Sequence, residues 1–112
     1  RMLLNHGELN GHRFLEESSV KEIYSPHTQL DNDYGYNGYN LWITSRLYKE
    51  KGYGDEGLWT GGGYEGTHFW IDPKRNFVGL IMTQMFETPK AGHGRDNEIR
   101  GEVYKQIFKN EE

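Results

Sequence analysis

No cysteine occurs among the 112 residues, which excludes disulfide bonds, thiol catalysis and thiolate metal sites. The chain also lacks an apolar run long enough to span a bilayer. It has 13 basic residues against 17 acidic ones, a formal net charge of −4, and the basic residues form no continuous stripe. Nucleic acid is therefore not an expected partner, because nucleic-acid binding relies on clustered positive charge.

Large apolar residues are also few. Leu, Ile, Val and Phe together occupy 23 positions, near the lower bound for folded chains. Aromatic residues make up 14% of the chain, however, and disordered segments are poor in aromatics. We therefore predict a single folded unit over residues 1–112 with a modest core. Such a composition also favours burial of some surface against a segment outside this sequence.

Short local elements are expected in the N-terminal third. Asn10-Gly11 is a strong two-residue turn signal, which predicts a small hairpin between residues 8–9 and 13–15. Residues 17–24 predict a short helix that ends before a proline. Residues 31–39 are rich in Asn, Asp, Gly and Tyr and predict a loop.

The rest of the chain predicts a sheet followed by a helix. Strands are expected at residues 39–44, 58–60, 67–71 and 77–85. The last of these is almost continuously apolar, which is typical of a strand covered on both faces. Residues 97–109 predict a helix with a packing stripe formed by Val103, Tyr104, Ile107 and Phe108. The expected class is α+β, an antiparallel sheet packed with helices.

The most informative stretch runs from Leu58 to Pro73. Trp59-Thr60 leads into three consecutive glycines at positions 61–63, and an alternating aromatic strand follows. Glycines carry no Cβ, so a ligand or another chain can approach this part of the backbone closely. On the residues alone, a glycine-rich hairpin without any ligand is the favoured interpretation.

Trp59-Thr60-Gly61 resembles the triplet in the third signature segment of the penicillin-recognising serine hydrolases. The following Gly-Thr-x-Phe-Trp-Ile-Asp-Pro run and residues 77–84 look like the two strands that follow that triplet in the family's esterase-like branch. This superfamily contains class C β-lactamases, serine esterases and D-amino-acid peptidases. Residues 2–11 and 103–108 are similar to the family's preceding turn and closing helix. The resemblance implies an incomplete C-terminal portion of a β-lactamase-like (transpeptidase-like) fold, with the nucleophile upstream of Arg1.

The resemblance also implies a site. The backbone N–H of Gly62 would supply half of the oxyanion hole, and a register slip would move this role to a neighbouring glycine. Trp59 stands where lactamases carry a lysine, which favours esters or amides over β-lactams as substrates. The implied substrate-binding residues are Trp59, Thr60, Gly61, Gly63 and Tyr64.

Other motifs are interpreted as structural. Ser18-Ser19-Val20-Lys21 matches the family's Ser-x-x-Lys nucleophile pattern, but the pattern is short and the family's Tyr-x-Asn element is absent. Asp31 to Gly35 looks like half of a calcium loop, yet Trp42 occupies the position of the twelfth ligand. The five histidines include no ligand pair, and His68 is expected to pack. We therefore predict no metal and no cofactor.

Two functions remain from the sequence. The first is the substrate-wall segment of a serine hydrolase, inactive alone, which pairs with a missing N-terminal portion or self-associates. The alternative is a small carbohydrate-binding module that uses an aromatic cluster. That cluster consists of Tyr34, Tyr36, Tyr39, Trp42 and Tyr53. The compartment is undetermined by the sequence, since both cytoplasm and bacterial periplasm fit a chain without cysteine.

Overall fold

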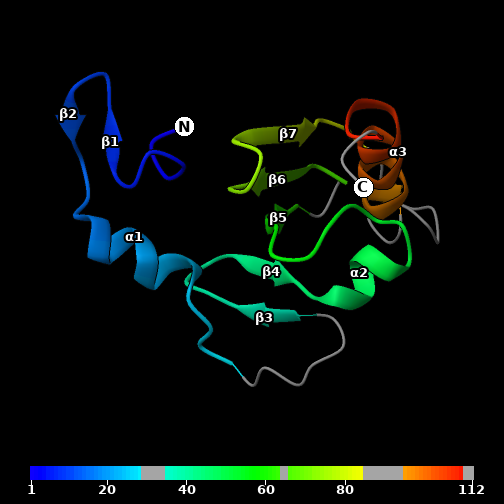
Figure 1. Ribbon diagram of the computed structural model, residues 1–112, viewed down its shortest axis with the longest axis horizontal. Helices are drawn as coiled ribbons and strands as arrows, with labels where there is room; N and C mark the ends of the chain where they lie inside the picture. Colours follow the sequence, from blue (N-terminus) through cyan, green and yellow to red (C-terminus); the bar gives the residue numbers. More distant parts are fainter. Residues whose placement is uncertain (29–34, 64–65, 85–94, 110–112) are drawn as a thin grey trace.

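The computed structural model describes residues 1–28, 35–63, 66–84 and 95–109 (Figure 1). A two-stranded sheet contains β1 (Glu8–Leu9) and β2 (His12–Arg13). A five-stranded sheet contains β3 (Gly35–Asn37), β4 (Trp42–Thr44), β5 (Trp59–Gly62), β6 (His68–Asp72) and β7 (Phe77–Ile81). The helices in this part of the chain are α1 (Glu17–Tyr24), α2 (Arg46–Glu50) and α3 (Arg95–Ile107). The predicted α+β class is confirmed.

The larger sheet is antiparallel throughout, and its spatial order β3-β4-β5-β6-β7 is also its sequence order. Trp59 pairs with Ile71, and Thr60 pairs with Trp70. Because side chains alternate across a strand, Trp59 and Ile71 share one face of the sheet while Thr60 and Trp70 share the other. We name these the α1 face and the α3 face after the helices beside them.

The α1 face carries an apolar core. Leu41, Ile43, Trp59 and Ile71 are buried there, and Ile23 and Tyr24 of α1 pack against them together with residues from the N-terminal segment. The rings of Tyr24 and Trp59 stack with their centroids 4.6 Å apart. Burial of such large side chains stabilises this face through the apolar area removed from water.

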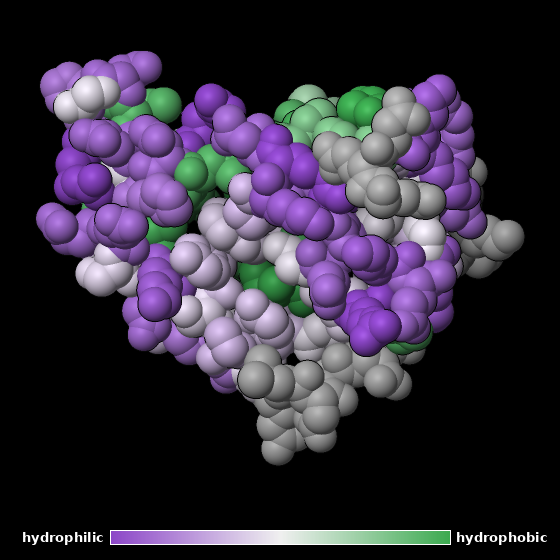
Figure 2. Space-filling view, viewed as in Figure 1, coloured by the Kyte–Doolittle hydropathy of each residue, from purple (hydrophilic) through white to green (hydrophobic). Residues whose placement is uncertain are grey.

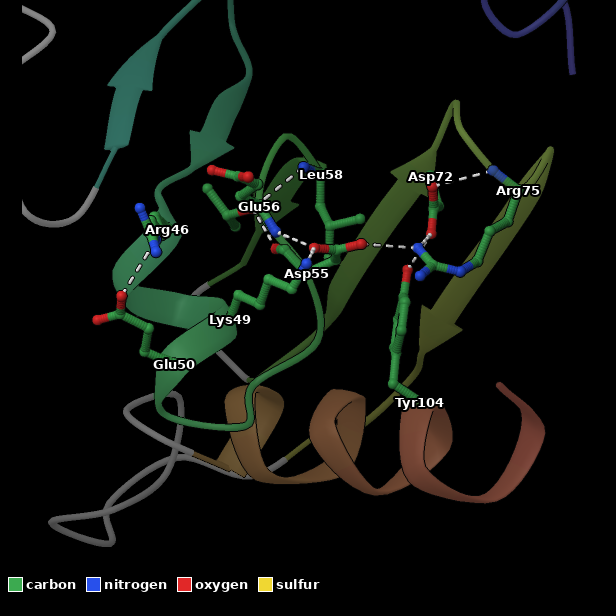
Figure 3. A network of polar contacts seen from close by, with 10 residues as sticks. Arg46, Lys49, Glu50, Asp55, Glu56, Leu58, Asp72, Arg75 and Tyr104 are labelled. Carbon is green, nitrogen blue, oxygen red and sulfur yellow. Dashed lines mark hydrogen bonds and ion pairs between the residues drawn. The ribbon is translucent and has the colours of Figure 1, made fainter. Parts of the chain in front are cut away.

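The α3 face combines aromatic packing with buried charge. Trp70 and Tyr104 form its core together with Leu58. The hydroxyl of Tyr104 donates to the carboxylate of Asp72 at 2.7 Å, and Arg75 donates to Asp72 at 2.8 Å and to Asp55 at 2.9 Å. Figure 3 shows these side chains converging between α2, the β6–β7 turn and α3.

The electrostatics of this network follow from its geometry. Burial alone raises the pKa of the Asp55 carboxyl, but donors from Arg75 and from the Glu56 N–H, with the charge of Lys49, outweigh burial and lower that pKa below its usual value. Burial, and then the bond to Asp72, raise the pKa of the Tyr104 hydroxyl. Both groups therefore keep one protonation state near neutral pH, so the network stays intact there.

Several local predictions are confirmed, and others are wrong. The hairpin at Asn10-Gly11 and the helix at residues 17–24 are present. The expected loop at residues 31–39 contains β3, and α2 was not predicted. Ile107, predicted to belong to the packing stripe of the last helix, is 59% exposed.

Strand β7 differs from the expectation of a strand that is covered on both faces. Among its described residues the α3 face is covered, but Val78 and Leu80 on the α1 face are 44% and 62% exposed, and Met82 beyond the strand is 78% exposed. The reason is that α1 and the N-terminal segment pack over the middle of the sheet. Figure 2 shows hydrophobic surface at the rim of the molecule where β7 lies. None of the helices in the described ranges is both long and apolar enough to traverse a membrane.

Candidate functional site

Strand β5 carries the glycine run at its C-terminal end. Gly62 lies opposite His68 in the pairing with β6, and the N–H of Gly63 donates to the carbonyl oxygen of Thr67 at 2.7 Å. Hydrogen-bonded and non-hydrogen-bonded pairs alternate along an antiparallel ladder. The N–H of Gly62 therefore points away from β6, toward the side of the sheet where β4 begins at Trp42.

The three glycines differ in the room around them. A Cβ on Gly61 would lie 2.5 Å from the ring of Phe69, so a larger residue there would displace that ring. A Cβ on Gly62 or Gly63 would meet nothing closer than 3.5 Å and 3.6 Å, which is ordinary contact. Alanine at position 62 should therefore preserve both the strand and its backbone N–H.

A hollow of about 650 Å³ opens on the α3 face beside this strand end. Its walls come from β4, α2, β5, β6 and the first two turns of α3, and they include Thr60, Gly62, His68, Asp96 and Arg100. Most of these side chains carry polar or charged groups. We name this space the polar hollow.

Arg100 is the buried charge of the polar hollow, with only 1% of its surface exposed. Its guanidinium donates to the Tyr53 carbonyl at 2.6 Å, to Asn97 Oδ1 at 2.6 Å and to His68 Nε2 at 2.9 Å. Because a guanidinium can only donate, Nε2 of His68 is the acceptor and the ring proton lies on Nδ1. That Nδ1 faces the carboxylate of Asp96 at 3.4 Å.

The protonation state of His68 follows from these neighbours. Burial lowers the pKa of the imidazole, the carboxylate of Asp96 acts to raise it, and the positive charge of Arg100 lowers it further. The net result is a pKa below the usual value. His68 is thus a neutral ring that accepts a hydrogen bond from Arg100, so its Nε2 is already occupied. It packs, as the sequence suggested, but within a polar network.

A second hollow, of about 330 Å³, lies on the α1 face. It is lined mainly by apolar side chains, including Leu3, Ile23 and Phe69, and by Gly61 and Gly62. The two glycines therefore border both this apolar hollow and the polar hollow. Since glycine has no side chain, the main chain of the strand end is reachable from both faces of the sheet.

The other predicted site residues lie in different surroundings. Thr60 lines the polar hollow, and its hydroxyl donates to the carbonyl of Trp42 at 2.8 Å. Trp59 is 6% exposed, stacks on Tyr24 and lines neither hollow, so contact with a substrate would require the Tyr24 ring to move. Tyr64 lies outside the described residues.

The motifs interpreted as structural are placed as follows. Ser18 and Lys21 lie exposed on α1, and neither lines the polar or the apolar hollow. Of the half calcium loop, residues 31–34 lie outside the described part of the chain. Within the described ranges no cluster of His, Asp and Glu is arranged to hold a metal ion.

Sequence reasoning missed the roles of Arg100 and Asp96 in the polar hollow, and it also missed Tyr48, which lines the same hollow. One signal was present: Asn97 and Arg100 are three residues apart in the predicted last helix, on the same face as Tyr104. An arginine in line with a packing stripe indicates a buried, hydrogen-bonded cation. Its partner His68 is 32 positions away in the sequence, so the pair itself had no local signature.

A scan against protein-family models finds no match to this chain, and a search of curated proteins finds no relative. The candidate site is therefore characterised by its own residues, by the outward N–H of Gly62 and by the two hollows that meet at the glycines.

Proposed function

We propose that this chain forms the substrate wall of a serine hydrolase that cleaves esters or amides through an acyl-enzyme. The observation that carries the proposal is the direction of the Gly62 N–H, which points away from β6 at a strand end bordered by two hollows. A donor held in a sheet needs no reorganisation when negative charge develops on an attacked carbonyl oxygen. The sequence resemblance supplies the class of reaction.

The chemistry divides between this chain and another segment. Gly62 would stabilise the oxyanion, and the apolar hollow beside Phe69 would accept a hydrocarbon part of the substrate. His68 is not the general base in this arrangement, because Arg100 occupies its Nε2. The nucleophile and its base are therefore expected from a segment that carries the Ser-x-x-Lys and Tyr-x-Asn motifs.

Strand β7 supports such a partner. It lies at the edge of the sheet, and its exposed residues Val78 and Leu80, followed by Met82, present apolar side chains on one face. Exposed apolar patches of this kind commonly mark interaction surfaces. We assign this surface to the nucleophile-bearing segment, and self-association of the chain is the competing arrangement.

The carbohydrate-binding alternative has less support. A stacking platform needs aromatic rings on one surface, but Tyr36 pairs with Ile43 on the α1 face while Trp42 lines the polar hollow on the α3 face. Tyr39 stacks on His27 instead, with ring centroids 3.9 Å apart. The described members of the aromatic cluster are therefore divided between surfaces.

Activity of the full-length protein tests the proposal. With a chromogenic ester, Gly62→Pro should lower kcat/KM by about a hundredfold or more, because one lost oxyanion donor costs roughly 3–4 kcal/mol. Gly62→Ala is the matched control, because it keeps the N–H and fits the available space. The 112-residue chain alone should be inactive.

Three results would overturn the proposal. The first is unchanged turnover in Gly62→Pro. The second is turnover by the isolated chain that Ser18→Ala abolishes, which would make Ser18 the nucleophile. The third is an upstream reading frame that contains neither the Ser-x-x-Lys nor the Tyr-x-Asn motif.

In the assembled enzyme, Leu80→Lys should weaken the association of the two parts without unfolding this one, because Leu80 is exposed.

A further inference from the structure

Another hollow, distinct from the polar and the apolar hollows, lies on the α3 side of the molecule, and most of its charged lining residues are basic. It measures about 370 Å³ and lies between α2, the turn that joins β6 to β7, and α3. None of its described lining residues also lines the polar hollow. Figure 3 shows part of its rim, where Lys49, Arg75 and Tyr104 approach one another above α3. We name it the basic hollow.

Positive charge is concentrated in the basic hollow. Four lysines line it together with Arg75, whereas Asp55 is the single acidic residue of its walls in the part of the chain that the structure describes. The four are Lys49, Lys74, Lys105 and Lys109. They come from three separate elements, so the fold brings them together. This contrasts with the net charge of −4 for the whole chain.

Among the described residues, carboxylates pair with only part of this charge. Arg75 holds Asp55 and Asp72, and the ammonium of Lys49 lies 3.4 Å from Asp55. Within the part of the chain that the structure describes, none of the other three lysines forms an ion pair. Among these described groups alone, five cations face the two carboxylates of Asp55 and Asp72, so positive groups outnumber negative ones by three.

The walls of the basic hollow strengthen its field. The guanidinium of Arg75 lies 5.3 Å from the ring centroid of Tyr104 and 5.1 Å from that of Phe108, and both rings line the hollow. Ring walls of low dielectric constant keep water away from a neighbouring charge, which reduces screening and increases the attraction of that charge for an anion. Gly52 and Gly101 also line the hollow, and their backbones are in close contact, so no side chain fills this wall.

We propose that the basic hollow binds a small anion that carries two or three linked phosphate groups. Lysine ammonium groups bind phosphate oxygens as point charges. Four lysines around one hollow repel each other, and an anion of charge near −3 or −4 relieves that repulsion by lying between them. A linked phosphate chain can reach lysines that project from different elements, whereas a single phosphate contacts fewer of them.

Titration calorimetry with inorganic triphosphate on the 112-residue chain tests the proposal. The double variant Lys105→Gln, Lys109→Gln should bind about tenfold more weakly at low salt, because two of the attracting charges are removed. The double variant Lys21→Gln, Arg46→Gln removes the same charge away from the hollow and should bind like the unmodified protein. All four positions are exposed, so both variants should fold, which circular dichroism verifies.

The outcomes separate the proposal from general charge attraction. Specific binding predicts one site, weakening in the first double variant and weaker binding of citrate, which carries a similar charge on carboxylates. No heat of binding at millimolar triphosphate would overturn the proposal. Equal weakening in both double variants, or equal affinity for citrate, would also overturn the assignment of a phosphate site. None of these readouts depends on hydrolase activity.

Discussion

The two faces of the five-stranded sheet are held by different forces, although the same strands supply both. On the α1 face, Trp59 stacks on Tyr24 among aliphatic side chains. On the α3 face, Asp72, Arg75 and Arg100 are fixed by hydrogen bonds beside Trp70. When an apolar side chain is shortened, the face loses only the contacts which that side chain made. When a buried ion pair loses one member, the other member remains as an unpaired charge in a poorly solvated place. The α3 face should therefore be the more sensitive to single substitutions and to pH.

Arg75→Met should produce the largest effect. It keeps an apolar stem beside Tyr104 and Phe108 but leaves Asp55 and Asp72 without their main partner. Removal of one member of a buried ion pair costs about 3–5 kcal/mol, so the free energy of unfolding in urea should fall by that amount.

Arg46→Met is the matched control for this prediction. Arg46 pairs with Glu50 on α2, but its side chain is 79% exposed. An exposed pair of this kind contributes about 0.3–0.5 kcal/mol. Similar losses in both variants would show that the network on the α3 face does not differ energetically from surface pairs.

Two glycine substitutions compare the faces through packing. A Cβ on Gly79 would overlap the indole of Trp70, which is 2% exposed and enclosed by α3. A Cβ on Gly61 would press on Phe69, which is only partly buried and has room to turn. Gly79→Ala should therefore destabilise by about 1–3 kcal/mol, and Gly61→Ala by less. Urea unfolding of both variants measures the difference, and the reverse order would contradict a more rigid α3 face.

The smallest effect expected is a pH dependence from His68. Its folded-state pKa lies below the usual value of about 6.5, so between these two pKa values the unfolded chain binds more protons than the folded one. The contribution of His68 to the free energy of unfolding should be fully present above about pH 6.5. It should be lost as the pH falls from there to the folded-state pKa. Among the described residues, Asp96 and Arg100 are the charged groups that face the ring.

Between about pH 7.5 and 5 the carboxylates stay ionised. In this range His68→Gln should remove the part of the decline in stability that comes from protonation of His68. Its amide oxygen can still accept the bond from Arg100. His12→Gln, at an exposed position, is the control and should keep the pH profile of the unmodified chain. An unchanged profile in His68→Gln would assign the pH dependence to other groups.

Local signals in the sequence predicted local structure well. Asn10-Gly11 predicted its hairpin, and the pattern of residues 17–24 predicted α1 with the observed bounds. Strand β3 was missed because turn-forming residues surround it and its pairing with β4 is a tertiary feature. Helix α2 was missed because five residues give too little periodicity to detect.

The candidate site was predictable only in part. The glycine run indicated an accessible backbone, and the structure locates it at a strand end between two hollows. The burial of Trp59 could not be predicted, because it depends on Tyr24 of a distant helix. The pairing of His68 with Arg100 depends likewise on where α3 docks. The oxyanion role of Gly62 stays a prediction.

The order of the strands also bears on how the chain folds. Every strand of the larger sheet pairs with its neighbour in the sequence, so the sheet can grow by successive short closures with little loop entropy to overcome. Helix α3 follows all five strands of this sheet, yet it supplies Tyr104 as one partner of Asp72, and Asp96 and Arg100 as partners of His68. Until α3 docks, these polar groups can stay hydrated on an open sheet. We therefore expect the charged face to lose its water last, when α3 docks on the sheet.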